Sequence, residues 1–320
     1  MPIPNPLDHP ICLAEPLRLA PSAWAGHVPF AMFLVDVLCP RTIVELGTHT
    51  GVSYCAFCQA VEALKLDARC YALDTWEGDE HAGFYGPEVL ADLRAHHDPR
   101  YGSFSRLVQS TFDEALTLFE DGTIDLLHID GCHTYEAVRH DSESWLPKMS
   151  SRGVVVLHDT GERLPGFGVW KFWEEVKARY RHFEFTHEHG LGLFVTGSRE
   201  TDALRRMLDA PEAEATLFRE LFRQLGERLR LRLDWEQQSA VVASLSNQLS
   251  ANEQVIQSLS NQLGANDQII QSLASQLSEK EAVLRRILNS RAWRWVERYG
   301  RAKGRLLTPY HRLLRPRPKQ

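Results

Sequence analysis

Short apolar runs alternate with segments of helical spacing over residues 1–198 of the chain. Runs rich in β-branched and large aliphatic residues predict buried strands at 42–46, 70–73, 104–108, 124–129 and 153–157. Helices are predicted at 23–38, 52–64, 112–119 and 167–180. A further helix lies within 84–101, through Val89 and Leu93, and another carries Val138, Asp141 and Trp145. Two further strands, 183–186 and 191–195, follow each other without a helix and predict a closing hairpin. This order predicts an α/β fold with a doubly wound, Rossmann-like sheet of seven strands.

From Val242 onward the apolar residues follow a seven-residue repeat. One core position is always apolar, in the series Val242, Leu249, Ile256, Leu263, Ile270, Leu277 and Leu284. Three residues further on the series is Leu245, Asn252, Leu259, Asn266, Leu273, Lys280 and Ile287. This period predicts a left-handed coiled coil, and asparagine in its core favours one register and oligomer state. Since an isolated helix of such polarity is marginal in water, we expect residues 241–289 to form a parallel homo-oligomer.

These patterns divide the chain into five parts. Residues 1–40 form an N-terminal lead-in with one helix, 41–198 form the α/β domain, and 199–240 form a helical connector. The coiled coil at 241–289 is followed by a basic tail at 290–320.

The basic tail differs in charge from the rest of the chain. It holds ten Lys or Arg and one Glu, a balance of +9, whereas the whole chain carries −6, so residues 1–289 carry −15. Trp, Tyr and Leu are interspersed with its arginines, which suits an amphipathic helix on an anionic membrane surface. Binding to nucleic acid is less expected, and packing on the acidic part of the chain is a further alternative.

The overall composition is that of an ordinary soluble protein, with 43% hydrophobic and 24% charged residues. No apolar run approaches the roughly 18–20 residues that span a bilayer, and the N-terminus shows no secretory signal. Of the six cysteines, Cys55 and Cys58 form a C-x-x-C, but no second pair completes a zinc site. We therefore expect reduced thiols, with a metal or redox role as the alternative. We therefore expect a cytoplasmic protein that is at most peripheral to the inner membrane.

The first predicted strand ends in a glycine turn, within the sequence TIVELGTHTGVSY at 42–54. Gly47 and Gly51 allow a tight turn whose bare backbone a nucleotide-like ligand can approach. Glu45 precedes the first glycine by two residues, and its carboxylate is expected to point into the ligand crevice. Oxidoreductases of this architecture instead show GxGxxG and place the acid after the next strand. An ordinary tight turn without a ligand is the alternative.

Polar residues follow the ends of the predicted parallel strands, where ligands bind in such sheets. The candidates are Glu45, Asp74, Ser110, Asp130 and Asp159. Asp74 can accept hydrogen bonds from a ribose diol, or it can cap its own loop. Trp76 can cover an adenine ring, or it can belong to the core.

Three of the candidate residues suit acid–base or metal chemistry. Asp130 and His133 occur in HIDGCHTY, and Asp159 occurs in LHDT. Two carboxylates can hold a hard divalent cation, which lowers the pKa of a substrate hydroxyl, so Asp130 and Asp159 are the expected metal ligands. His133 is the expected general base, together with Asp130 as a catalytic residue. Capping of the following helices by the two aspartates is the alternative.

Three segments resemble class I S-adenosylmethionine-dependent methyltransferases of the macrocin O-methyltransferase type and their relatives from bacterial surface-polysaccharide clusters. These segments are HIDGCHTYEAVRHDSESWLPKMSSRGVVVLHDT, YALDTWEGDEHAGFYG and STFDEA. The resemblance covers about residues 40–197, and H-I-D-G-x-H-x-Y is its most specific part. It implies S-adenosylmethionine as methyl donor, a sugar or other hydroxyl as acceptor, and often Mg²⁺.

Carried over by position, the resemblance also implies site residues. The methionine side of the cofactor would meet Glu45, Gly47, Thr48 and Gly51, the ribose would meet Asp74, with Thr75 and Trp76 beside it, and the adenine would meet Ser110 and Thr111. Asp130, His133 and Asp159 would face the acceptor. Metal-dependent relatives often carry two acids after the fifth strand, whereas Thr160 follows Asp159 here. That departure puts the metal, more than the fold, in question.

Three functions therefore compete. The leading one is an O-methyltransferase that acts on a sugar hydroxyl of bacterial surface polysaccharide or a related glycan. An NAD(P)-dependent oxidoreductase is the alternative enzyme, disfavoured by the glycine spacing and the closing hairpin. A catalytically inactive coiled-coil scaffold in a glycan assembly complex is the third, and intact acids at 45, 74 and 130 count against it.

Overall fold

The structure, a computed structural model, describes residues 2–79, 81 and 83–313. Residues 314–320, the end of the expected basic tail, lie outside the described residues. The chain divides into two compact units, 1–238 and 239–320. The two units are described separately below.

Seven strands of the first unit form one mixed sheet in the order β5-β2-β1-β6-β7-β9-β8. The strands are β1 (Thr42–Leu46), β2 (Arg69–Asp74), β5 (Ser105–Gln109), β6 (Ile124–Ile129), β7 (Met149–His158), β8 (His182–Phe185) and β9 (Leu191–Val195). The five strands β5, β2, β1, β6 and β7 are parallel to one another, and β9 is antiparallel to both β7 and β8. The doubly wound seven-stranded sheet with its closing hairpin is therefore confirmed.

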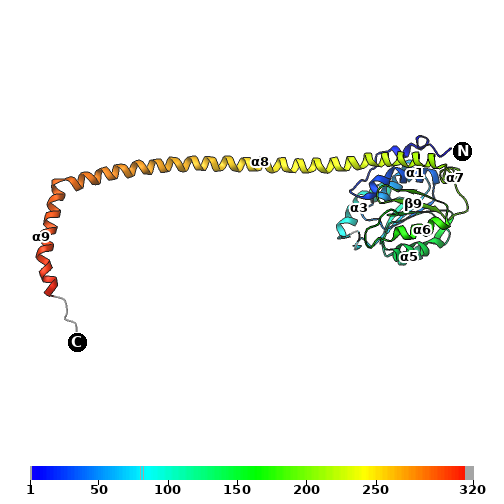
Figure 1. Ribbon diagram of the computed structural model, residues 1–320, viewed down its shortest axis with the longest axis horizontal. Coiled ribbons are helices and arrows are strands. Elements are labelled where there is room, and N and C mark those ends of the chain that lie inside the picture. Colours follow the sequence, from blue (N-terminus) through cyan, green and yellow to red (C-terminus); the bar gives the residue numbers. More distant parts are fainter. Residues whose placement is uncertain (1, 80, 82, 314–320) are drawn as a thin grey trace, which may run out of the picture. The chain divides into compact units, whose positions relative to one another are not determined.

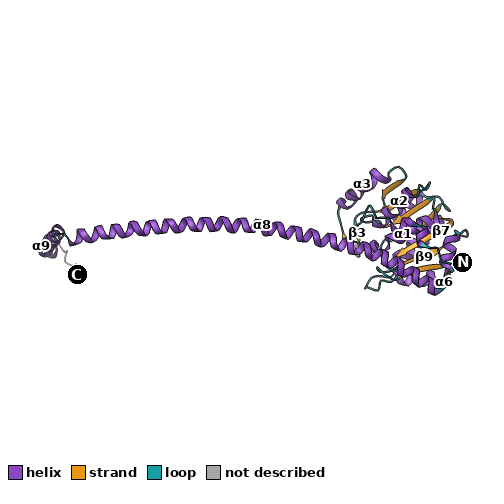
Figure 2. Cartoon of the chain, turned by 90° about the horizontal axis from the view of Figure 1, so that it is seen from above, coloured by secondary structure: helices purple, strands orange, loops and turns teal. Residues whose placement is uncertain are grey.

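Helices cover both faces of this sheet, as Figure 1 shows for α1 and α6 on opposite sides of β9. One face carries α1 (Val28–Leu38), α2 (Val52–Ala63) and α3 (Pro87–Tyr101). The other face carries α4 (Phe112–Ala115), α5 (Tyr135–Trp145) and α6 (Val169–Arg179). Short 3₁₀ turns complete the unit, at η1 (Pro6–Asp8), η2 (Pro10–Leu13), η3 (Ala23–His27), η4 (Leu116–Leu118) and η5 (Leu146–Lys148). In Figure 2 the orange strands lie among these purple helices.

The central strands are buried on both faces, which explains their continuous apolar runs. Successive side chains of a strand point to opposite faces of the sheet. In β1, Ile43 accordingly belongs to the core under α1 and α2, and Val44 belongs to the core under α5 and α6. A strand whose two faces are both covered needs apolar residues at consecutive positions.

The expected connector at 199–240 is in part a structural element of the α/β domain. It contains α7 (Asp202–Leu208) and the beginning of α8 (Glu212–Asn289). Phe218 and Phe222 of α8 are buried, with ring centroids 5.4 Å from Phe33 and from Phe30 of α1, respectively. The beginning of α8 therefore packs into the same core as α1.

The second unit consists of the rest of α8 and α9 (Arg291–Leu313). The predicted long helix is confirmed. The apolar heptad residues between Val242 and Ile287 are 49–65% exposed in this single chain. The coiled coil itself stays a prediction, because it needs other copies of the chain to cover those residues.

Candidate active site

A cavity of about 250 Å³ opens beyond the carboxyl ends of β1, β2 and β6. The strand order reverses between β1 and β6, and doubly wound sheets bind ligands at such a point. The predicted site residues in its wall are Gly47, Thr48, Asp74, Thr75, Thr111, Asp130 and His133. The structure thus brings together seven of the residues that the sequence singles out. The other five, Glu45, Gly51, Trp76, Ser110 and Asp159, are not in the wall.

The glycine turn is held in shape by Asp74. The Oδ2 atom of Asp74 accepts hydrogen bonds from the backbone N–H groups of Thr48 (2.8 Å) and His49 (2.9 Å). Its Oδ1 atom accepts one from the N–H of Trp76 (2.7 Å). Gly47 has a φ of +85°, and a Cβ there would lie 2.1 Å from the backbone oxygen of Asp130. The turn therefore requires glycine, and Asp74 caps its loop while it also lines the cavity.

Glu45 does not point into this cavity, contrary to the expectation from sequence. It lies directly opposite His128 in the register of β1 and β6, and its Oε2 atom is 2.8 Å from Nδ1 of His128. Both side chains are fully buried, and the rings of Trp24 and Phe57 pack against His128. Burial raises the pKa of the Glu45 carboxyl, and its hydrogen bond with His128 partly opposes this rise. The face of the strand that Glu45 occupies is covered by helix, so its carboxylate has no path to the crevice.

The remaining residues outside the wall have structural positions. Trp76 is buried in the core, and its Nε1–H donates to the backbone oxygen of His49 (3.0 Å). The core alternative therefore describes Trp76 better than an adenine cover. Gly51 has a φ of +79° and begins α2, with Leu93 of α3 packed against it. Ser110 precedes Thr111, whose hydroxyl caps α4 by accepting from the N–H of Glu114.

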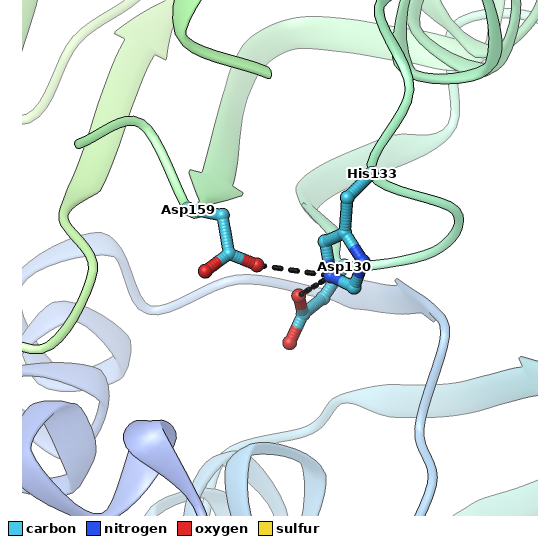
Figure 3. Close-up of side chains that lie close together, drawn as sticks. All are labelled: Asp130, His133 and Asp159. Atoms are coloured by element: carbon cyan, nitrogen blue, oxygen red, sulfur yellow. Dashed lines mark ion pairs between the residues drawn. The ribbon is translucent and has the colours of Figure 1, made fainter. Parts of the chain in front are cut away.

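Asp130, His133 and Asp159 form a compact cluster at the ends of β6 and β7 (Figure 3). The Nε2 atom of His133 lies 2.9 Å from Oδ2 of Asp159 and 3.6 Å from Oδ1 of Asp130. The three side chains are partly buried, so solvent screens their charges only weakly. Asp159 has a φ of +61°, which turns the chain sharply after β7. The sequence predicted this cluster, since ends of neighbouring parallel strands meet at one edge.

His158, the last residue of β7, is a fourth member of the cluster. Its Nδ1 atom lies 3.4 Å from Oδ1 of Asp130 and 3.3 Å from Oδ2 of Asp159. Its Nε2 atom lies 3.2 Å from the backbone oxygen of Glu188. Both ring nitrogens therefore face acceptors, as in a protonated imidazole. The only sequence signal was its place immediately before Asp159.

The electrostatics of the cluster follow from two carboxylates facing two imidazoles. Burial lowers the pKa of His133, but its hydrogen bonds with Asp130 and Asp159 raise it to about 10. Burial likewise lowers the pKa of His158, and the two aspartates raise it to about 10. Burial raises the pKa of the Asp159 carboxyl, yet His158 and His133 hold it at about 2. Near pH 7 the two charge pairs are thus formed, and His133 carries a proton.

Two loops in which the sequence predicted no functional residue lie beside the cluster. Phe167, which precedes α6, stacks on His133 with ring centroids 4.9 Å apart, and His81 lies 4.9 Å from Phe167. His81 belongs to a small hairpin, β3 (Gly78–Asp79) and β4 (Gly83–Phe84), which the sequence did not predict. Strands of two residues are too short to show an apolar period. This hairpin adds Tyr85, stacked on His49, to the cavity wall.

The cluster also fits a divalent cation by its donor set. Asp130, His133 and Asp159 each offer one ligand atom, and these atoms lie within 4.8 Å of one another. Two carboxylates suit Mg²⁺, and an added imidazole also suits transition metals such as Mn²⁺ or Fe²⁺.

The fold and its site define a class of protein. A mixed seven-stranded sheet with a closing antiparallel hairpin, and a ligand cavity beside a glycine turn after the first strand, is the class I methyltransferase fold. The sequence profile of a family described as a methyltransferase domain matches residues 44–160. This segment contains the glycine turn, Asp74 and the Asp–His cluster.

Among related sequences, the uncharacterized protein y4gI of Sinorhizobium fredii is 51% identical over 193 residues. The match covers 60% of this chain and 21% of that protein, so the chain spans about a fifth of its relative's length.

Two solved structures are similar at low identity. The O-methyltransferase TomG from Streptomyces achromogenes, in complex with S-adenosylmethionine, is 17% identical, with a TM-score of 0.42 over 56% of this chain and 82% of TomG. The methyltransferase PaMTH1 of Podospora anserina, bound to SAH, is 16% identical, with a TM-score of 0.40 over 52% of this chain and 76% of PaMTH1. Likenesses of this size carry no conclusion about cofactor or substrate.

Proposed function

We propose that this protein is an S-adenosylmethionine-dependent O-methyltransferase. One observation carries the proposal: the cavity beside the glycine turn also has Asp130 and His133 in its wall. A methyl donor bound at the glycine turn and an acceptor hydroxyl next to the Asp–His cluster would then lie in the same cavity. Such proximity supplies much of the rate of a methyl transfer, since the reaction needs the two reactants aligned.

The residues of the cavity fit the proposed cofactor. Gly47 presents bare backbone, and the Asp74 carboxylate lies at the end of β2 in the cavity wall. Oδ1 of Asp74 accepts from a single backbone N–H, that of Trp76, and so keeps a lone pair for a ligand hydroxyl. Thr48, Thr75 and Thr111 line the same wall. S-adenosylmethionine, when bound, supplies a methyl group activated by a positively charged sulfur.

The cluster has the groups that a hydroxyl acceptor needs. The hydroxyl must lose its proton as the methyl group is transferred, and a positioned side chain can receive that proton. With His133 protonated, its Nε2–H orients an acceptor oxygen and the carboxylates of Asp130 and Asp159 are the proton-accepting atoms. A Mg²⁺ ion on the two aspartates would lower the pKa of the hydroxyl itself. His133 acts as a general base only in its neutral form.

We infer further that the acceptor is a sugar hydroxyl of a bacterial surface polysaccharide or a related glycan, modified in the cytoplasm. The resemblance of residues 40–197 to methyltransferases of polysaccharide clusters supports this. The strand order of the sheet argues against the alternative, an NAD(P)-dependent oxidoreductase. The dinucleotide-binding order 3-2-1-4-5-6 has no antiparallel strand inserted before the last one, whereas β9 lies between β7 and β8 here.

Calorimetry of the full chain with S-adenosylmethionine and, separately, with NAD(H) tests the proposal. We expect micromolar binding of S-adenosylmethionine and no heat from the dinucleotide. The reverse pattern would overturn the proposal, and binding of neither would favour an inactive scaffold. Transfer of a labelled methyl group to surface polysaccharide from cells lacking the gene then tests the acceptor.

The proposal also includes a parallel homo-oligomer formed through residues 241–289. The heptad residues of α8 are exposed in the single chain, and a second copy in register would cover them.

A further inference from the structure

The helix α9 is a separate element with its own beginning. Ser290 ends α8 by donating from its hydroxyl to the backbone oxygen of Ile287 (2.7 Å). The same hydroxyl oxygen accepts from the N–H of Trp293 (3.1 Å), and so Ser290 caps the first turn of α9. The heptad series ends before this point, at Ile287. The apolar residues of α9 therefore do not continue the heptad repeat of α8, and α9 presents a surface of its own.

Basic and apolar positions lie on different sides of α9. At 3.6 residues per turn, all its arginine positions fall within about 80° around the helix axis, at 291, 294, 298, 301, 305 and 312. All its large apolar or aromatic positions fall within a second arc of about 160°, at 293, 295, 296, 299, 306, 307, 310 and 313. Lys303 falls within the apolar arc, where its long stem can carry the charge out to the arc's edge.

The two arcs meet at Trp295. Its ring stacks on that of Tyr299 with centroids 5.9 Å apart and an angle of 7° between the planes. Trp295, Arg291, Arg294 and Arg298 line one shallow hollow. Three guanidinium groups beside an amphipathic aromatic ring fit the level of a bilayer at which lipid phosphates lie.

We propose that α9 lies in the surface of an anionic membrane, with the Trp295–Tyr299 side in the acyl boundary and the arginine arc on lipid phosphates. Basic amphipathic helices with aromatic residues on their apolar side bind in this way. Among the helices that the structure describes, none is long and apolar enough to cross a bilayer. Duplex nucleic acid would accept the arginines but would leave the exposed apolar arc in water. Opposite charge adds to this attraction, because residues 290–320 carry +9 and the membrane surface is negative.

Flotation of the full chain with vesicles tests this proposal without any methyl acceptor. We expect binding to vesicles of phosphatidylglycerol and phosphatidylcholine, little binding to phosphatidylcholine alone, and loss of binding at high salt. Equal binding to both kinds of vesicle, or to neither, would overturn the proposal.

Matched variants make the test specific. Trp295→Gln and Trp235→Gln remove the same ring from positions that are 69% and 68% exposed, one in α9 and one in α8. Trp295→Gln should weaken vesicle binding about tenfold and Trp235→Gln should not change it. Arg294→Gln with Arg298→Gln should weaken binding about 25-fold, at roughly fivefold per charge. The control is Arg285→Gln with Arg286→Gln, which removes the same charge from α8.

A DNA duplex added as competitor separates the two kinds of partner. If the duplex bound the full chain and Trp295→Gln left that binding unchanged while vesicles were not bound, α9 would be a nucleic-acid helix. Equal vesicle binding by the Trp295 and Trp235 variants would also contradict the proposal.

Discussion

The Nε2 atom of His133 lies 2.9 Å from the Oδ2 atom of Asp159, and the two residues come from the ends of neighbouring parallel strands. The Nδ1 atom of His158 lies 3.3 Å from the same oxygen. Two imidazoles and two carboxylates thus neutralise one another in a partly buried site. Such an arrangement holds each group in place, and removal of one partner leaves a charge without compensation.

His133→Ala should abolish most methyl transfer without loss of cofactor binding. The imidazole is in the cavity wall next to Asp130, whereas the glycine turn and Asp74 remain in place. Loss of the Nε2–H donor that orients the acceptor oxygen should cost on the order of 10²–10³ in rate. Turnover with a glycan acceptor and calorimetry with S-adenosylmethionine measure the two effects. The control is His140→Ala, an exposed residue of α5 paired with Asp113. Wild-type turnover in the His133 variant would remove this residue from the reaction.

Asp74→Ala should weaken the binding of S-adenosylmethionine at least tenfold, or about 1.4 kcal/mol. The substitution removes the acceptor of the N–H groups of Thr48, His49 and Trp76, so the glycine turn loses its support. Calorimetry measures the affinity, and circular dichroism checks that the domain stays folded. An unchanged affinity in a folded variant would show that the cofactor binds elsewhere.

Asp141→Asn should stabilise the protein at neutral pH. Burial raises the pKa of the Asp141 carboxyl from 3.8 to about 6, so the folded state holds its proton more tightly than the unfolded state. Below pH 3.8 the carboxyl is protonated in both states, and the penalty of a buried charge grows as pH rises to about 6. The asparagine variant should therefore gain up to about 3 kcal/mol at pH 7.5, at 1.4 kcal/mol per pKa unit, and nothing near pH 3.5.

Chemical denaturation at the two pH values measures this gain. The exposed Asp67→Asn is the control, and it should show little change at either pH. A gain of the same size at both pH values would contradict the assignment of a raised pKa to Asp141.

Leu259→Lys with Leu263→Lys should convert the proposed coiled-coil oligomer to monomers. Both side chains are exposed heptad core positions of α8, and charge in a coiled-coil core prevents close packing. The control, Gln254→Lys with Asn261→Lys, adds the same charge on the opposite side of the heptad. Sedimentation velocity at micromolar concentration measures the mass of each. A wild-type chain that sediments as a monomer would end the coiled-coil proposal.

The strands could be predicted because a strand that is buried on both faces is a continuous apolar run in the sequence. The bounds of β6 and β9 coincide with the apolar runs at 124–129 and 191–195. β7 begins earlier than its apolar run, at Met149 rather than Gly153. Met149 is buried and pairs with Ile124 of β6, whereas the three residues after it are polar and partly or fully exposed, and the register shifts before Val154. Composition alone does not reveal that pairing.

The candidate site could likewise be predicted from sequence only in part. Asp130, His133 and Asp159 could be brought together from sequence, because parallel strands end at one edge of the sheet. The orientation of Glu45 could not, because it depends on His128 across the sheet and on the Trp24 ring that packs against His128. His81 and Phe167 were missed for a related reason, as they reach His133 from loops distant in sequence.

The order of amino acids was enough to establish the strand–helix alternation, the glycine turn, the acids at the strand ends and the long helix. Each of these follows from local period or from a residue's distance to the end of its strand. Tertiary packing alone decided which of the acids reach the cavity, because burial under a neighbouring element can turn a side chain from ligand contact into core. It also made the beginning of α8 part of the α/β domain, because Phe218 and Phe222 pack against apolar side chains of α1.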